Sequence, residues 1–320
     1  MNGDGQPDLL RSFKTPTGQT TKETYLHNGS GWDATASGPY APPTLFYNFA
    51  TDTAAPVAEM QDVNADGLLD VMRAYRSGNG ASRRTTWLNT GAGWVQEADY
   101  ALPAWTHDFQ TMKGRLGEFV DINADGLVDF QYSYRNVSGQ NIIAAYLNTG
   151  HGWYRDDNYE LPSSLHDYAV MDGRLGTLLD IDGDGTADFV RSYKNTQGAH
   201  SKASYLSNNA QTDLLVTLTN GLGAVTEIDY AALTSDDSFH APASSPCAYP
   251  CIAISPGLSA VQQVRTPDGI GGTRDTDYSY IGAKLDVDGR GFLGFEALST
   301  LAEREDESGT PTTLVTTTFY

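Results

Sequence analysis

An aspartate-rich motif recurs at a fixed interval and constrains the fold more than any other feature of the chain. Residues 62–70, 121–129 and 180–188 share the pattern Asp-x-Asn/Asp-x-Asp-Gly-x-x-Asp, and successive copies begin 59 residues apart. A partial copy occupies residues 2–8. Repeats of this length are supersecondary units that bury a continuous core only by stacking on their neighbours. The sequence therefore predicts an array of about 59-residue units over residues 1–212.

Two further markers keep the same interval. Leu-x-x-Gly-x-Gly-Trp runs end at Trp32, Trp94 and Trp153, and the run 114–117, Gly-Arg-Leu-Gly, recurs at 173–176. The tryptophans are expected to pack between neighbouring units, because repeated aromatic residues usually form a core, although sugar stacking is an alternative.

Short alternating segments separate these markers and indicate strands. Residues 129–134 alternate, and residues 141–147 run into a glycine-rich turn. A helical period of 3.6 residues is missing, which excludes a helical solenoid. Three or four short strands in each unit are typical of a propeller blade. We therefore expect an all-β fold in which residues 1–212 form part of a β-propeller.

The repeated loops have the composition of calcium sites. Ca²⁺ takes six to eight oxygen ligands, and the glycine at the sixth position permits the sharp turn that brings them together. Positions one, three, five and nine offer side-chain oxygens, and position seven offers a backbone carbonyl. The candidate ligands are Asn2, Asp4, Asp8, Asp62, Asn64, Asp66, Leu68, Asp70, Asp121, Asn123, Asp125, Leu127, Asp129, Asp180, Asp182, Asp184, Thr186 and Asp188. The alternative is a set of Asx turns with solvated carboxylates.

Charge and composition exclude several classes of function. The chain has 40 acidic and 20 basic residues, for a formal net charge of −20, and would repel nucleic acid and anionic lipid. No run of 18 apolar residues is present, so no membrane span is expected. The first residues also lack the basic and apolar regions of a signal peptide.

Residues 213–320 carry no copy of the repeat and are expected to form a second domain. Hairpins are predicted over 213–230, 258–281 and 292–320, which together make an antiparallel sheet of at least six strands. A long loop over 234–257 holds Cys247 and Cys251, for which a disulfide and two free thiols are both open. The run 289–294 matches G-x-G-x-x-G, but it opens a strand rather than a helix, which argues against nucleotide binding.

Both parts resemble known families. The aspartate loops are similar to FG-GAP/VCBS-type repeats of integrin-like propellers. Residues 220–226, 268–273 and above all 289–295, Gly-Arg-Gly-Phe-Leu-Gly-Phe, resemble the B component of bacterial insecticidal toxin complexes and related Rhs/YD-repeat proteins. The resemblance implies a propeller that docks onto a translocation pore, followed by the start of an Rhs-type shell around a toxic region. It also implies a secreted bacterial protein.

The sequence predicts no catalytic site. His107 and His166 lie 59 residues apart, each before an aspartate, and such duplication favours a structural hydrogen bond over catalysis. A Gly-x-Ser-x-Gly nucleophile elbow is missing. We therefore expect a non-enzymatic scaffold and docking segment whose partner is a translocation pore or the remaining shell of the same chain. A freestanding calcium-dependent adhesin or lectin-like propeller that binds glycans is the alternative, and an enzyme with propeller blades is more distant.

Overall fold

The computed structural model describes residues 1–33, 38–51, 55–207, 214–244, 247–254, 258–287, 291–305 and 311–319. These residues form β-strands and one short 3-10 turn, η1 (Asp157–Tyr159), with no α-helix among them. The prediction of an all-β fold is confirmed. No helix in the described ranges has the length and apolar character needed to cross a membrane.

The chain divides into two compact units. Unit 1 comprises Met1–Leu179 and Ala187–Ala210, and unit 2 comprises Asp180–Thr186 and Gln211–Tyr320. The predicted boundary between residues 212 and 213 lies outside the described residues. Among the residues described, unit 1 holds four sheets and unit 2 holds one.

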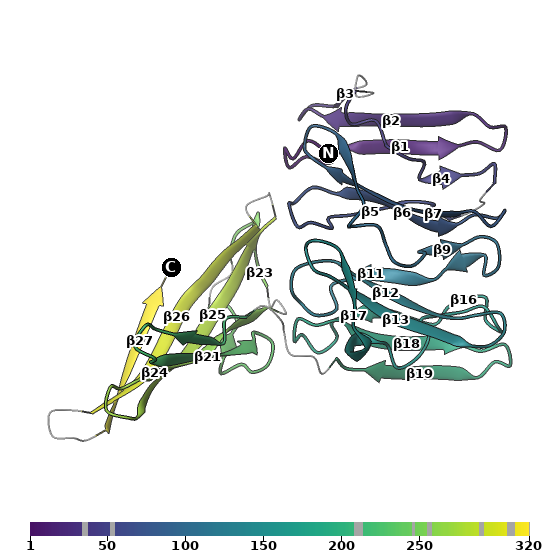
Figure 1. Cartoon of the computed structure of the whole chain (residues 1–320). Coiled ribbons are helices and arrows are strands. Elements are labelled where there is room, and N and C mark those ends of the chain that lie inside the picture. Colours follow the sequence, from purple (N-terminus) through teal and green to yellow (C-terminus); the bar gives the residue numbers. More distant parts are fainter. Residues whose placement is uncertain are drawn as a thin grey trace. The chain divides into compact units, whose positions relative to one another are not determined.

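The four sheets of unit 1 follow one another in chain order, from purple to green in Figure 1. Sheet 1 contains β1 (Leu9–Lys14), β2 (Thr20–His27), β3 (Trp32–Asp33) and β4 (Tyr47–Asn48). Sheet 2 contains β5 (Glu59–Gln61), β6 (Asp70–Arg76), β7 (Ser82–Asn89), β8 (Trp94–Glu97), β9 (His107–Asp108) and β10 (Gly114–Arg115). Sheet 3 contains β11 (Gly117–Val120), β12 (Asp129–Arg135), β13 (Asn141–Asn148), β14 (Trp153–Arg155), β15 (His166–Asp167) and β16 (Gly173–Arg174). Sheet 4 contains β17 (Gly176–Leu179), β18 (Asp188–Lys194) and β19 (His200–Tyr205).

Sheets 2 and 3 repeat one pairing scheme. In sheet 2, one edge of β6 pairs with β7. The other edge of β6 pairs with β5 near the start of β6 and with β9 near its end. The pairing with β9 is parallel, whereas the other two are antiparallel. In sheet 3, β12 pairs with β13, β11 and β15 in the same way. Each 59-residue repeat of the sequence therefore corresponds to one sheet.

The core of unit 1 lies where successive sheets pack together. Met72 of β6 and Phe130 of β12 are almost completely buried and belong to one cluster with Val63 and Leu102. Trp153 packs against this cluster, and its Nε1 donates to the carbonyl oxygen of Tyr100 at 3.0 Å. This contact supports the expectation that the repeated aromatic residues join neighbouring units, although Trp32 is half exposed.

The Gly-Arg-Leu-Gly marker is explained by close packing. A Cβ on Gly117 would lie 2.4 Å from the carbonyl oxygen of Gln131, and a Cβ on Gly114 would overlap the hydroxyl of Tyr168 in the next sheet. Leu116, between them, is 1% exposed. Glycine is therefore required for space rather than for a turn at both ends of this copy and at Gly176 of the next, whereas a Cβ on Gly173 would meet no close neighbour.

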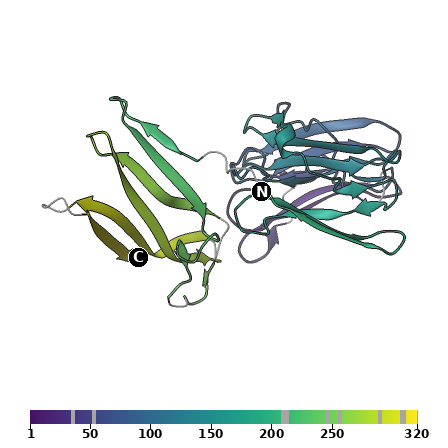
Figure 2. The same cartoon turned by 90° about the horizontal axis from the view of Figure 1, so that it is seen from below.

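Unit 2 is built on one twisted sheet, green to yellow in Figure 2. Its main path runs through β20 (Thr217–Thr219), β21 (Val225–Ala232), β24 (Ser259–Pro267), β25 (Thr273–Asp286), β26 (Gly291–Glu305) and β27 (Pro311–Phe319). Neighbouring strands on this path are antiparallel, as predicted.

The segment 234–257 contains more structure than the long loop expected from its sequence. β22 (His240–Ala241) and β23 (Cys251–Ala253) both pair with β25, and the pairing of β22 is parallel. Cys247 and Cys251 form a disulfide, with Cα atoms 5.5 Å apart. The sequence showed neither strand, because two or three residues are too few for a period of two to appear.

Candidate functional site

Each complete aspartate-rich loop joins two antiparallel strands. The loops connect β5 to β6, β11 to β12, and β17 to β18, and the partial copy precedes β1. The glycine at the sixth position has a positive φ in each complete loop, +84° at Gly67 and Gly126 and +89° at Gly185. Residues with a Cβ rarely adopt this conformation. The turn therefore depends on this glycine, as its place in the motif indicated.

The carboxylates at the first and fifth positions of each loop accept hydrogen bonds from the loop's own backbone. At the first position, Asp62, Asp121 and Asp180 accept from the amides of Gly67, Gly126 and Gly185 at 2.8, 2.9 and 3.0 Å. At the fifth position, Asp66, Asp125 and Asp184 accept from the amides of Leu68, Leu127 and Thr186 at 2.8, 2.8 and 2.7 Å. In the partial copy, Asp4 accepts from the amide of Gln6 at 2.9 Å and from the side chain of Asn2 at 2.9 Å. These bonds orient the carboxylates around each turn.

The ninth-position aspartate has a second role that sequence reasoning missed. Its carboxylate accepts the amide of the residue 19 positions later, at the end of the next hairpin. The four pairs are Asp8 with His27 at 2.9 Å, and Asp70 with Asn89, Asp129 with Asn148, and Asp188 with Ser207 at 2.7 Å each. Asp70 and Asp129 also accept amides of their own loops at 3.0 Å. This aspartate therefore ties the loop to the sheet.

Burial makes two of these carboxylates hard to ionise. It raises the pKa of Asp70 to about 6 and that of Asp129 to about 7, although two backbone hydrogen bonds oppose the shift in each case. The neighbouring loop aspartates raise both values further, since like charges repel. A bound cation would reverse this effect by favouring the charged forms.

The fourth loop has the geometry closest to a metal site. Within the part of the chain that the structure describes, Asp180, Asp182 and Asp188 form an acidic group whose potential ligand atoms lie within 4.8 Å of one another. Asp180 and Asp182 are exposed, whereas Asp188 is buried. In the second and third loops the third position is Asn64 or Asn123, whose side-chain amide donates to the next aspartate at 3.0 or 2.9 Å. Three carboxylates on one turn suit a hard divalent cation.

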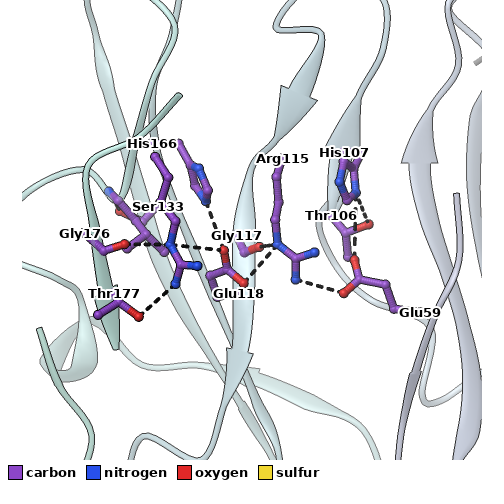
Figure 3. A network of polar contacts seen from close by, with 12 residues as sticks. Glu59, Thr106, His107, Arg115, Gly117, Glu118, Ser133, His166, Gly176 and Thr177 are labelled. Carbon is purple, nitrogen blue, oxygen red and sulfur yellow. Dashed lines mark hydrogen bonds and ion pairs between the residues drawn. The ribbon is translucent and has the colours of Figure 1, made fainter. Parts of the chain in front are cut away.

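A second polar arrangement runs through the interior of unit 1 (Figure 3). Arg115 on β10 lies between two carboxylates, with its Nη2 2.8 Å from Glu59 on β5 and its Nε 3.0 Å from Glu118 on β11. Glu118 also lies 3.4 Å from His166 Nε2 and 3.8 Å from Arg174 Nε. His107 Nδ1 lies 3.8 Å from Glu59. We call these six residues the Glu-Arg-His ladder.

The two carboxylates of the ladder respond oppositely to their surroundings. Burial dominates at Glu59 and raises its pKa, despite the nearby Arg115. Burial also disfavours ionisation of Glu118, but the contact with His166 and the charges of Arg115 and Arg174 outweigh it and lower the pKa. Burial, reinforced by the charge of Arg115, lowers the pKa of His107 to about 3. His107 is therefore neutral at pH 7.

The ladder joins sheets rather than forming an open reaction site. His107 and His166 are each 3% exposed, and their rings stack against Phe109 and Tyr168. The ion pair between Arg115 on β10 and Glu118 on β11 connects sheet 2 to sheet 3. The sequence predicted a structural hydrogen bond for the duplicated histidines, and the structure places them beside Glu59 and Glu118. The sequence did not identify Glu59, Glu118, Arg115 and Arg174 as members of this ladder. Glu59 and Glu118 lie 59 residues apart, as do Arg115 and Arg174 of the Gly-Arg-Leu-Gly marker. This shared interval was the sequence signal that could have identified them.

Part of the chain is similar to a known protein family. Residues 169–320 match the family model described as the insecticide toxin TcdB middle/N-terminal region. No curated protein matches the sequence. A solved structure, titled for specific recognition of non-reducing terminal N-acetylglucosamine by an Agrocybe aegerita lectin, is 15% identical with a TM-score of 0.37, covering 97% of this chain and 79% of that chain. This TM-score is too low to carry an argument. Residues 169–320 are thus similar to a region of an insecticidal toxin component.

Proposed function

We propose that the chain is a non-enzymatic scaffold and docking segment of a secreted bacterial toxin-complex component. The similarity of residues 169–320 to the TcdB middle/N-terminal region is the observation that carries this proposal. The matched range includes all of sheet 4 in unit 1 and continues through unit 2. Its partner would be another protein, because a net charge of −20 disfavours nucleic acid and anionic lipid surfaces.

In this proposal the sheets of unit 1 are blades of an incomplete FG-GAP/VCBS-type propeller. Sheets 2 and 3 each contain four consecutive antiparallel strands, β5 to β8 and β11 to β14, which is the number in a propeller blade. Unit 2 would begin an Rhs-type shell. Its long β25 and β26, of 14 and 15 residues, suit a large enclosing sheet. Unit 1 would then dock a translocation pore, and unit 2 would lead into the enclosure of a toxic region.

Calcium is proposed to stabilise the aspartate-rich loops. The arrangement of Asp180, Asp182 and Asp188 supports the fourth loop as the strongest site. The carbonyl oxygen of Thr186, at the seventh position, would be a further ligand. The other loops would bind through the same motif positions, with asparagine replacing aspartate at the third position.

The size of the native product tests the proposed function. An antibody raised against this 320-residue chain would be used on culture fractions of the source organism, and the reading frame would be sequenced on both sides. A secreted product far larger than 34.5 kDa, whose frame continues into YD repeats, is the expected result. A secreted product near 34.5 kDa would contradict the toxin-complex assignment and favour a freestanding adhesin, for which glycan binding is the next measurement.

A further inference from the structure

A pocket of about 610 Å³ opens between sheet 1 and the segment that leads into β5. Its walls include the rings of Phe13, Tyr47 and Phe49, together with Pro56 and Glu59. Tyr47 and Phe49 stack with ring centroids 5.7 Å apart, and each is 40% exposed. The pocket therefore combines an accessible aromatic wall with Glu59, a member of the Glu-Arg-His ladder whose side chain is 13% exposed.

The repeat shows which side chain normally occupies the position of Pro56. One backbone hydrogen bond recurs in each of the first three 59-residue repeats and aligns them with one another. Its donor and acceptor are Val57 N and Phe46 O, Leu116 N and Thr106 O, and Leu175 N and Leu165 O, each pair 2.7 Å apart. The residue before each donor is Pro56, Arg115 or Arg174. In the first repeat, proline therefore stands at the position that the ladder arginine occupies in the next two repeats.

The ladder histidine is also replaced in the first repeat, by Tyr47. Parallel pairing aligns Tyr47 on β4 with His107 on β9 and His166 on β15, since each is the first residue of its two-residue strand. The stacking of Tyr47 on Phe49 repeats that of the two histidines on Phe109 and Tyr168. The first repeat therefore keeps the ring contact but lacks both the arginine and the histidine of the ladder.

Glu59 consequently has fewer cationic partners than its equivalent Glu118. Glu118 lies within 4.0 Å of two arginines, Arg115 and Arg174, whereas Glu59 has Arg115 and shares it. Glu59 Oε1 is buried and lies 3.8 Å from His107 Nδ1, without a donor at ordinary hydrogen-bond distance among the described residues, although the Thr106 side chain also interacts with the Glu59 carboxylate. Among the described residues that line the pocket, Arg11 is the one cation, and it is paired with Glu23 at 3.1 Å.

We propose that this pocket binds an arginine side chain of a protein partner. The partner would thereby supply the guanidinium that the first repeat lacks, because Pro56 stands at the arginine position. Its stem would stack on Tyr47 and Phe49, and its guanidinium would approach Glu59 as Arg115 approaches Glu118. Arginine is favoured over lysine because its planar guanidinium stacks on aromatic rings and bonds carboxylates in a fork. A net charge of −20 would also attract a basic segment. This pocket would be a site at which the chain docks its protein partner, and the inference that the partner is a protein rests on the proposed docking function.

The methionine methyl groups provide a direct test in the full 320-residue chain. Met60 lines the pocket, whereas Met72 is buried in the core at 1% exposure and serves as an internal reference. With ¹³C-methyl methionine labelling, titration with acetyl-Gly-Arg-Gly-amide is expected to shift the Met60 signal saturably and leave that of Met72 unmoved. The matched citrulline peptide, which has the same shape without the charge, should bind about tenfold more weakly or less.

Two variants separate binding from folding. Pro56→Arg supplies the missing side chain within the chain and should weaken peptide binding by about tenfold or more, whereas Pro56→Ala should leave it unchanged. A Met60 signal that does not respond, equal binding of the two peptides, or undiminished binding to Pro56→Arg would each overturn the proposal. Such a failure would leave the toxin-complex assignment standing, because that depends on the size of the native product.

Discussion

His107 and His166 occupy the same position in successive sheets, and each is buried beside a glutamate. A buried histidine with a low pKa stays neutral in the folded protein while the unfolded chain takes up a proton. Between the unfolded pKa of about 6.5 and the folded pKa of about 3, the unfolded state therefore binds more protons. The contribution of His107 to stability is complete above pH 6.5 and is lost as the pH falls through this window.

The variant His107→Phe tests this consequence. It keeps a ring against Phe109 but has no proton to bind. Between pH 6.5 and 5, the wild type should lose about 2 kcal/mol of unfolding free energy more than the variant does. Urea denaturation at a series of pH values measures the difference, with exposed His200 replaced in a control variant. Equal pH slopes for the wild type and His107→Phe would refute the prediction.

Asp129 illustrates how one residue serves both the loop and the sheet. It is fully buried and accepts the amides of Ile122 and Asn148. In Asp129→Asn, one of these amides would face an NH₂ group, so we expect a loss of about 1–3 kcal/mol even in the presence of EGTA. Thermal unfolding against Asp99→Asn, an exposed aspartate outside the loops, measures the loss. A purely ligating role would instead leave the metal-free stability unchanged.

At the scale of elements, Arg115 and Arg174 form a natural comparison. Both occupy the same position in the repeat, but Arg115 is 24% exposed between two glutamates, whereas Arg174 is 49% exposed and its Nη2 donates to Thr177. Replacing Arg115 by glutamine should cost about 2–4 kcal/mol, because a buried carboxylate loses its ion pair. Arg174→Gln should cost less than about 1 kcal/mol, as an exposed pair does.

Urea denaturation of the two arginine variants measures these costs. The double variant Arg115→Gln with Glu118→Gln should recover part of the loss, since it also removes one uncompensated charge. Equal effects of the two single substitutions would show that the ladder does not bind sheet 2 to sheet 3.

The elements themselves were predictable to different degrees. Strands bounded by glycine-rich turns, such as β12 and β13, were found because alternation and turn residues are local signals. β22 and β9 have two residues each and depend on pairing with a distant strand, so no local pattern marks them. The disulfide was left open for a similar reason, because a spacing of four residues permits the bond without requiring it.

At the scale of the whole molecule, the proposed calcium sites act together. With a dissociation constant of about 0.1–1 mM, calcium at about 2 mM would add roughly 0.6–1.8 kcal/mol per site. Four sites would add several kcal/mol, which is a large share of the stability of a typical protein. EGTA should therefore lower the melting temperature strongly, and magnesium should restore it poorly.

Differential scanning calorimetry with calcium, with EGTA, and with magnesium after EGTA measures this stabilisation. The variant Asp180→Ala with Asp182→Ala should lose one site's share of the calcium effect, whereas the exposed Asp157→Ala should keep all of it. A melting temperature that is the same with calcium and EGTA would defeat the calcium proposal.

The sequence by itself determined the β class, the repeat length and the turn of each loop, because these depend on residues within a few positions of one another. Tertiary structure decided which distant residues meet. The ninth-position aspartates reach amides 19 residues away, and the ladder joins Glu59 to Arg115 across 56 residues. Such contacts follow from strand pairing and the packing of sheets, which composition and spacing do not encode. The replacement of a ladder arginine by Pro56 is therefore evident only from the backbone hydrogen bonds that align the repeats.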